Sequence, residues 1–119
     1  MKILIVDDAK LIHFMVKKIL NANDLTEIEY ADAFDGEEGI EKAKSFQPDL
    51  ILLDVVMPKK DGIEALKEIK EHNKAANVIM VSSLGTDEKV SEALKLGASA
   101  FIQKPFDDDE LCTHVKNAK

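Results

Sequence analysis

Short runs of apolar and β-branched residues alternate along the chain with longer stretches whose apolar residues recur every three or four positions. Strands that are buried on both faces have continuous apolar runs, whereas a helix packed on a sheet carries one apolar stripe. The continuous runs therefore predict strands over residues 2–6, 27–31, 50–53, 78–81 and 100–103.

The stretches that follow these runs have the spacing of amphipathic helices. The longest stripe has the spacing i, i+3, i+4, i+7, i+8 and consists of Ile12, Met15, Val16, Ile19 and Leu20. Shorter stripes of the same kind are Ile40 with Ala43, Ile63 with Leu66 and Ile69, Val90 with Ala93 and Leu94, and Leu111 with Val115 and Ala118. A helix is therefore expected after each strand.

Residues suited to helix ends stand at the expected boundaries. Asp35 with Glu38, and Asp107 with Glu110, have the spacing of an N-terminal capping box. Gly97 follows Leu96, where a helix commonly ends in a left-handed glycine. These signals support the strand and helix assignment.

Strict alternation of strands and helices predicts an α/β fold with a parallel sheet covered by helices on both faces. With five strands, the flavodoxin-like (βα)5 three-layer sandwich with strand order 2-1-3-4-5 fits best, and residues 1–119 are expected to form one domain. In such sheets ligands bind at the carboxyl ends of the strands, where the strand order reverses.

Polar residues stand at the carboxyl ends of four of the predicted strands: Asp7 and Asp8, Asp54, Ser82 and Ser83, and Lys104. Because parallel strands all point the same way, these side chains should converge on one edge of the sheet. A charged carboxylate is rarely buried without a partner. We therefore expect Asp54 to stand in a cleft at the rim of the sheet rather than in the core.

The chemistry of these residue types indicates a pocket that binds a phosphoryl group. Grouped carboxylates favour a hard cation, Mg²⁺ first, which also takes phosphate oxygens as ligands. Aspartate is a known nucleophile toward phosphorus, Lys104 could neutralise phosphate charge, and Ser82 could donate a hydrogen bond to it. Two plainer alternatives remain open: Asp7 and Asp8 could only cap the following helix, and Lys104 could form a structural salt bridge.

Composition and charge exclude several other classes. The net charge of −7 argues against binding to nucleic acid or to an anionic membrane surface. The single cysteine, Cys112, allows no internal disulfide and fits a reducing compartment. The chain has no signal-peptide pattern at its start and no apolar run near the ~20 residues of a membrane span. A cytoplasmic location is expected.

Four segments give the sequence a specific resemblance over nearly its whole length: "ILIVDDA" (3–9), "PDLILLDVVMPKKDG" (48–62), "VIMVSS" (78–83) and "GASAFIQKPF" (97–106). In order and spacing they resemble the receiver domain of two-component response regulators. The size of the chain is similar to that of the single-domain chemotaxis regulators within this family.

The resemblance implies roles for the acidic residues. Asp54 would accept a phosphoryl group from a histidine kinase. Asp7 and Asp8 would hold Mg²⁺ together with Asp54 and the backbone carbonyl of Val56. The protein would then catalyse only its own phosphorylation and dephosphorylation.

The resemblance also implies a switch. Ser82 would be the hydroxyl that moves toward the phosphoryl group, and Lys104 would pair with it. The bond between Lys104 and Pro105 would be cis, and Phe101 would be the aromatic residue that turns inward. A downstream protein would bind the changed face formed by the fourth helix, the fifth strand and the fifth helix.

The partners implied are a histidine kinase, an effector such as the flagellar motor switch, and a phosphatase, with the chain itself a monomer. Chemotaxis is the first expectation, and a phosphorelay or sporulation-type receiver is the alternative. Val56 and Leu84, two residues after Asp54 and Ser82, are apolar where the family often has polar groups that influence the attacking water. Slow loss of the phosphoryl group is expected.

Three rival functions are weighed against this one. A phosphatase of the haloacid-dehalogenase type needs a second carboxylate where this chain has Val56, and its nucleophile follows the first strand. A flavodoxin-type electron carrier would have to hold a flavin phosphate against the acidic "DDAK" (7–10). A receiver-like module that is never phosphorylated remains open.

Other reactive residue types are not assigned to a site. His13, His72 and His114 have no partner at metal-ligand or catalytic-triad spacing and are expected on the surface or in packing. Cys112 is expected to be a packing residue, and Phe14 either packs or faces a partner.

Overall fold

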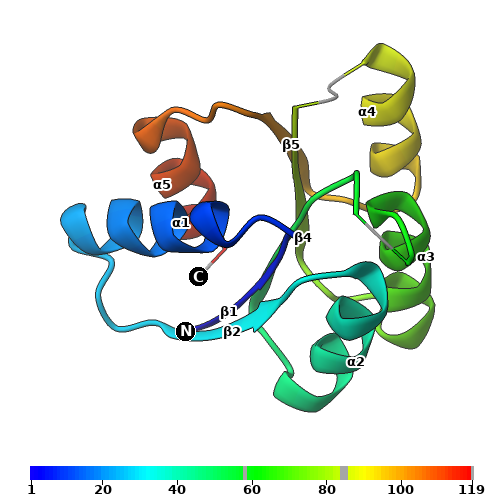
Figure 1. Cartoon of the computed structure of the whole chain (residues 1–119), viewed down its shortest axis with the longest axis horizontal. Coiled ribbons are helices and arrows are strands. Elements are labelled where there is room, and N and C mark those ends of the chain that lie inside the picture. Colours follow the sequence, from blue (N-terminus) through cyan, green and yellow to red (C-terminus); the bar gives the residue numbers. More distant parts are fainter. Residues whose placement is uncertain (58, 84–85, 119) are drawn as a thin grey trace.

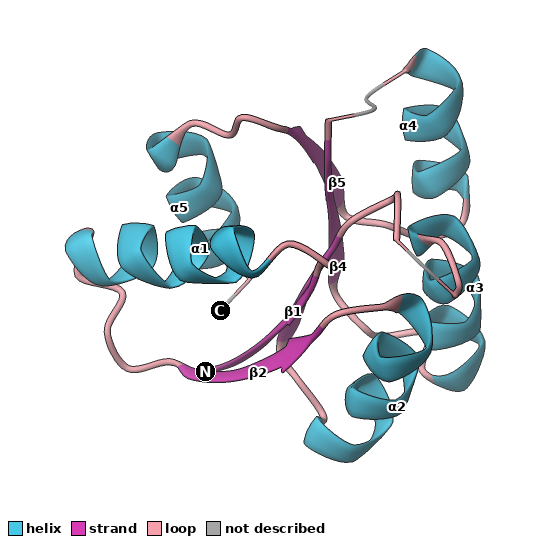
Figure 2. Cartoon of the chain, in the orientation of Figure 1, coloured by secondary structure: helices cyan, strands magenta, loops and turns pink. Residues whose placement is uncertain are grey.

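The computed structural model describes residues 1–57, 59–83 and 86–118 of the chain. Strands and helices alternate throughout (Figures 1 and 2). The elements in order are β1 (Lys2–Val6), α1 (Lys10–Ala22), β2 (Glu29–Ala33), α2 (Gly36–Phe46), β3 (Leu50–Leu53), α3 (Gly62–His72), β4 (Val78–Ser82), α4 (Asp87–Lys95), β5 (Ala100–Gln103) and α5 (Asp108–Asn117).

The strands form one parallel sheet in the order β2-β1-β3-β4-β5. Helices α1 and α5 cover one face, and α2, α3 and α4 cover the other (Figure 1). This arrangement confirms the flavodoxin-like three-layer sandwich that the sequence predicts. The strand order reverses between β1 and β3, so the ends of these two neighbours form the crevice in which such folds bind ligands.

The central strands are buried on both faces, as their continuous apolar runs predict. Alternate residues serve different layers: Leu4 and Leu53 belong to the core under α2, α3 and α4, while Ile5 and Leu52 belong to the core under α1 and α5. The edge strands β2 and β5 are only partly buried.

Most predicted helix boundaries are confirmed. Asp35 accepts a hydrogen bond from the Glu38 backbone nitrogen, and Gly97 follows α4 with a φ of 104°. Asp107 also caps its helix, but it accepts from the backbone nitrogen of Asp109 rather than from that of Glu110. Both predicted N-terminal caps are therefore confirmed.

The second strand lies two residues later than predicted. It covers Glu29–Ala33 instead of 27–31, because its pairing with β1 begins where Lys2 stands opposite Glu29. The prediction stopped short of Asp32, a polar residue whose charge is matched by Lys17 of α1.

Over the described ranges, no helix combines the length and apolarity that crossing a membrane would require.

Candidate functional site

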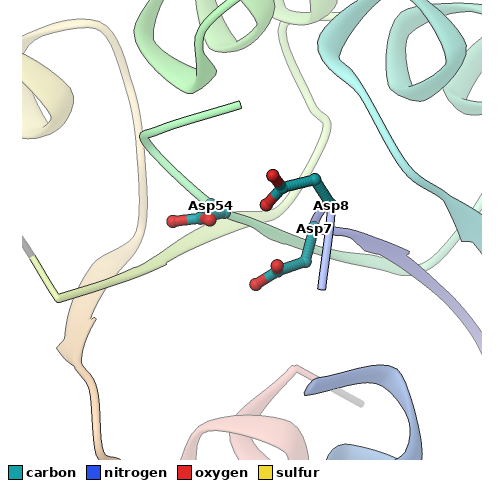
Figure 3. Close-up of side chains that lie close together, drawn as sticks. All are labelled: Asp7, Asp8 and Asp54. Carbon is teal, nitrogen blue, oxygen red and sulfur yellow. The ribbon is translucent and has the colours of Figure 1, made fainter. Parts of the chain in front are cut away.

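Three carboxylates meet where β1 and β3 end side by side. Asp7 and Asp8 follow β1, Asp54 follows β3, and the Asp54 backbone nitrogen donates to the Val6 carbonyl at 2.9 Å. One carboxylate oxygen from each of the three aspartates lies within 4.8 Å of those from the other two. Figure 3 shows the three side chains projecting to the same side of the strand ends.

Lys104 brings a positive charge into this group. Its Nζ donates to Asp7 Oδ2 at 2.6 Å and lies 3.4 Å from Asp54 Oδ2. Its backbone nitrogen donates to the Ser82 carbonyl at 2.9 Å, which ties the end of β5 to the end of β4. The predicted cis bond between Lys104 and Pro105 is confirmed.

The acidic side chains are more buried than the sequence suggested. Asp54 follows β3 at the edge where the strands end, as expected, but it is only 7 % exposed, and Asp7 is 2 % exposed. The two ends of the loop after β3 are joined by a hydrogen bond from the Gly62 nitrogen to the Val55 carbonyl at 2.7 Å. Asp8 is exposed and gives the group access to solvent.

Burial, followed by the neighbouring charge of Asp7, raises the pKa of Asp54 above its ordinary value, although Lys104 opposes the change. Three carboxylates and one ammonium leave two net negative charges in a small, partly desolvated space. A divalent cation would remove this repulsion.

The donor set fits Mg²⁺. Hard cations of this kind bind through one or two carboxylates and keep water or phosphate oxygens as further ligands. All three side chains offer oxygen, and the exposed Asp8 lets water reach the group.

The remaining predicted site residues are spread around this edge. Ser82 is buried at the end of β4, Val56 exposes its side chain in the loop after β3, and Phe101 lies half-buried on β5 against the core under α2, α3 and α4. Leu84 lies outside the described residues.

Sequence reasoning missed the contacts of one residue, His13. It is 4 % exposed and stacks on Phe34 with ring centroids 4.5 Å apart, which agrees with a packing role. Its Nδ1 also lies 2.7 Å from Asp32 Oδ1, and its Nε2 lies 2.8 Å from the Asp7 carbonyl oxygen. Nothing in the sequence spacing pointed to these partners.

The other unassigned residues behave more simply. His72 is exposed, His114 is half-buried, and Cys112 is buried in the core under α1 and α5. Phe14 is 62 % exposed on α1, which favours the alternative of a partner-facing residue over packing.

Comparison with known proteins gives the class. Residues 3–116 match the family described as the response regulator receiver domain. The chain is 44 % identical to the chemotaxis protein CheY of Bacillus subtilis over 110 residues, covering 92 % of this chain and 90 % of that one. It is 43 % identical to CheY of Halobacterium salinarum over 106 residues, covering 88 % and 85 % of the two chains.

Solved structures agree. The crystal structure of the CheX–CheY–BeF3–Mg complex from Borrelia burgdorferi superposes with a TM-score of 0.89 and 37 % identity, covering 98 % of this chain and 87 % of that one. The receiver domain of the Francisella response regulator 1452 superposes with a TM-score of 0.87 and 35 % sequence identity, covering 98 % of this chain and 94 % of that one.

The chain therefore belongs to the response regulator receiver family. Its function is that of a phospho-acceptor in two-component signal transduction, and its similarity is to the CheY proteins. This membership favours a signalling role over the phosphatase and flavin-carrier alternatives.

Proposed function

We propose that Asp54 is the residue that accepts the phosphoryl group. Asp7, Asp8, Asp54 and the backbone carbonyl of Val56 would hold Mg²⁺. The observation that carries the proposal is the meeting of three carboxylates with Lys104, whose ammonium lies 2.6 Å from Asp7 Oδ2 and 3.4 Å from Asp54 Oδ2.

Each residue of the pocket then has its own role in phosphoryl transfer. A carboxylate oxygen of Asp54 forms the new bond to phosphorus, while the bond from phosphorus to the donor's leaving group breaks. Lys104 and Ser82 stabilise the negative charge on the phosphoryl oxygens, the first as a cation and the second as a hydroxyl donor. Mg²⁺, when bound, supplies further charge neutralisation on the same oxygens.

The new charge would operate a switch. A phosphoryl group adds about −1.5 to −2 charge next to Asp7 and Lys104. Movement of Ser82 and Lys104 toward it would bias Phe101 and the face formed by α4, β5 and α5 between two arrangements. A downstream protein would bind the phosphorylated arrangement.

The similarity to CheY proteins supports chemotaxis as the pathway, with a histidine kinase as donor, the flagellar motor switch as effector and a phosphatase as further partner. The Borrelia relative was captured in a complex with CheX, so a protein of that kind is a candidate partner. A phosphorelay is the alternative. A monomeric state and a cytoplasmic location stay predictions.

The experiment that tests the proposal is phosphorylation by a small donor. The protein is mixed with acetyl phosphate in Mg²⁺ or in EDTA, and its intact mass is recorded. We expect a gain of one phosphoryl group per chain in Mg²⁺ and none in EDTA. No gain under either condition would support the receiver-like interaction module that is never phosphorylated.

Magnesium should stabilise the fold before any phosphorylation. A ligand that binds only the folded state at 100 times its Kd raises the free energy of unfolding by about 2.7 kcal/mol. Urea unfolding in saturating Mg²⁺ and in EDTA measures this difference. The stabilisation by Mg²⁺ should largely disappear in Asp8→Asn. If Mg²⁺ stabilises that variant as much as the wild type, Asp8 has no role in the metal site.

The phosphoryl group should be lost slowly, because the exposed side chain near the acceptor, Val56, cannot orient water. Val56→Asn supplies an amide and should shorten the half-life of the phosphorylated form several-fold, measured as decay of the added mass after the donor is removed. Leu94→Asn, a similar change on α4, is the control. An unchanged or longer half-life in Val56→Asn contradicts this explanation.

A further inference from the structure

A buried polar side chain of α1, that of His13, contacts the backbone of the acidic group at Asp7. His13 is 4 % exposed and has an acceptor oxygen against each ring nitrogen. Nε2 meets the Asp7 carbonyl at 2.8 Å and Nδ1 meets Asp32 Oδ1 at 2.7 Å. Since a carbonyl oxygen only accepts, His13 Nε2 is the donor in its contact with Asp7.

The Asp7 carbonyl needs this donor. Pairing between β1 and β2 ends with Val6 opposite Ala33, and the Asp7 nitrogen still donates to the Ala33 carbonyl at 3.1 Å. The Asp7 carbonyl lies beyond this ladder, in a buried residue, and an unpaired buried carbonyl is costly. His13 supplies the hydrogen bond from α1.

This one bond orients two metal-site residues. The Asp7 carbonyl and the Asp8 nitrogen belong to the same planar peptide unit, so fixing the carbonyl fixes that plane. The plane sets the directions in which the side chains of Asp7 and Asp8 leave the chain. Two further contacts, from Ala9 to Asp7 Oδ1 at 2.9 Å and from Lys104 to Asp7 Oδ2 at 2.6 Å, hold only the Asp7 side chain.

The histidine is itself held from its other side. Asp32 Oδ2 accepts from Lys17 Nζ at 2.8 Å, and Phe34 stacks on the imidazole ring. Desolvation raises the pKa of Asp32, but the hydrogen bonds from Lys17 and His13 outweigh it and leave that pKa below its ordinary value. Asp32 therefore remains a charged anchor that fixes the ring's position.

We propose that His13 is a positioning residue of the metal site, which holds the peptide between Asp7 and Asp8 so that both carboxylates face the cation. The proposal rests on the metal site of the proposed function. A partner that orients a ligand in this way commonly contributes about tenfold or more to metal affinity. His13 touches neither the phosphoryl group nor the cation.

Two near-isosteric variants separate this role from simple packing. In His13→Gln the terminal amide nitrogen reaches the place of Nε2 and can keep the bond to the Asp7 carbonyl. In His13→Asn the amide nitrogen takes the place of Nδ1 and can keep only the bond to Asp32. His13→Phe keeps the ring on Phe34 and loses both bonds, and His72→Phe is the exposed control.

The dissociation constant of Mg²⁺ itself is measured by titration calorimetry on each unphosphorylated protein, beside urea unfolding in EDTA. We expect Kd to rise about tenfold in the Phe and Asn variants and to stay within about twofold of wild type in the Gln variant and the control. Without metal, the Asn variant should be less stable than the Gln variant, because it leaves the Asp7 carbonyl unpaired.

Two outcomes would overturn the proposal. If Mg²⁺ binds all variants like the wild type and only their unfolding changes, His13 is a packing residue. If the Gln variant binds as weakly as the Asn variant, the bond to Asp7 does not position the site. A wild-type protein that takes up no Mg²⁺ would instead refute the metal site itself, and with it both proposals.

Discussion

Asp54→Asn is expected to abolish phosphorylation and, in buffer without metal, to stabilise the protein. An amide nitrogen or oxygen does not replace the carboxylate nucleophile, so incorporation should fall by at least about 10³-fold. The stabilisation follows because the substitution removes a desolvated charge that is repelled by Asp7. Lys104 loses little, since Asp7 Oδ2 remains 2.6 Å from its Nζ.

The pH dependence of this stabilisation has a definite sign. The pKa of Asp54 is raised in the folded protein by burial and by Asp7, so the folded state binds the proton more tightly than the unfolded chain does. The unfavourable contribution of Asp54 is therefore complete above its folded pKa and absent below the unfolded value of about 3.9. The advantage of Asp54→Asn should shrink as the pH falls through this window.

The measurement is urea unfolding in EDTA at neutral pH and at several acidic values, with intact mass after acetyl phosphate treatment in Mg²⁺. Asp109→Asn, an exposed residue of α5, is the matched control and should change unfolding by no more than about 0.5 kcal/mol. Wild-type levels of phosphorylation in Asp54→Asn would refute Asp54 as acceptor. A lower free energy of unfolding in Asp54→Asn than in the wild type at neutral pH would refute the destabilisation that we attribute to the buried Asp54 charge.

Of the substitutions considered, Gly62→Ala should lower the free energy of unfolding most. A Cβ on Gly62 would lie 1.9 Å from the Asp54 carbonyl oxygen and 2.7 Å from the Val55 Cα, both backbone atoms that cannot turn aside. To remove this clash, the loop after β3 would have to move as a whole. That movement would break the hydrogen bond that the Gly62 nitrogen donates to the Val55 carbonyl at 2.7 Å. Overpacking of this kind should lower the free energy of unfolding by about 3 kcal/mol.

Because the loop carries Asp54 and Val56, the same substitution should also slow phosphorylation of the molecules that remain folded. Lys67→Ala, on the exposed face of the same helix, is the control and should change unfolding by no more than about 0.5 kcal/mol. If the free energy of unfolding of Gly62→Ala lies within about 1 kcal/mol of the wild-type value, the close packing of Gly62 against the Asp54 carbonyl does not hold this loop in place.

The strands, their order and the grouping of acidic residues follow from the sequence because each depends on a local pattern. The run "LILL" of β3 is apolar at every position, and Asp54 comes directly after it. In a parallel sheet that position alone brings Asp54 to the same edge as Asp7. The acidic site could therefore be predicted without any tertiary contact.

The features that escaped prediction depend on contacts between distant residues. The near-complete burial of Asp54 and the hydrogen bond between Gly62 and Val55 both depend on how the loop after β3 folds, which no local pattern encodes. His13 meets Asp32, 19 positions away, only after α1 has packed beside β2. The shift of β2 has the same origin, since its register is set by pairing with β1.

The most direct test of the central claim is to locate the phosphoryl group in the wild-type chain. Borohydride reduces an aspartyl phosphate to homoserine, so protein treated with acetyl phosphate and Mg²⁺ is reduced, digested and sequenced by mass spectrometry. The account predicts homoserine at position 54, dependent on Mg²⁺ and absent without donor. Homoserine at position 7 or 8 instead, or phosphate retained on Ser82 or Ser83, would contradict it.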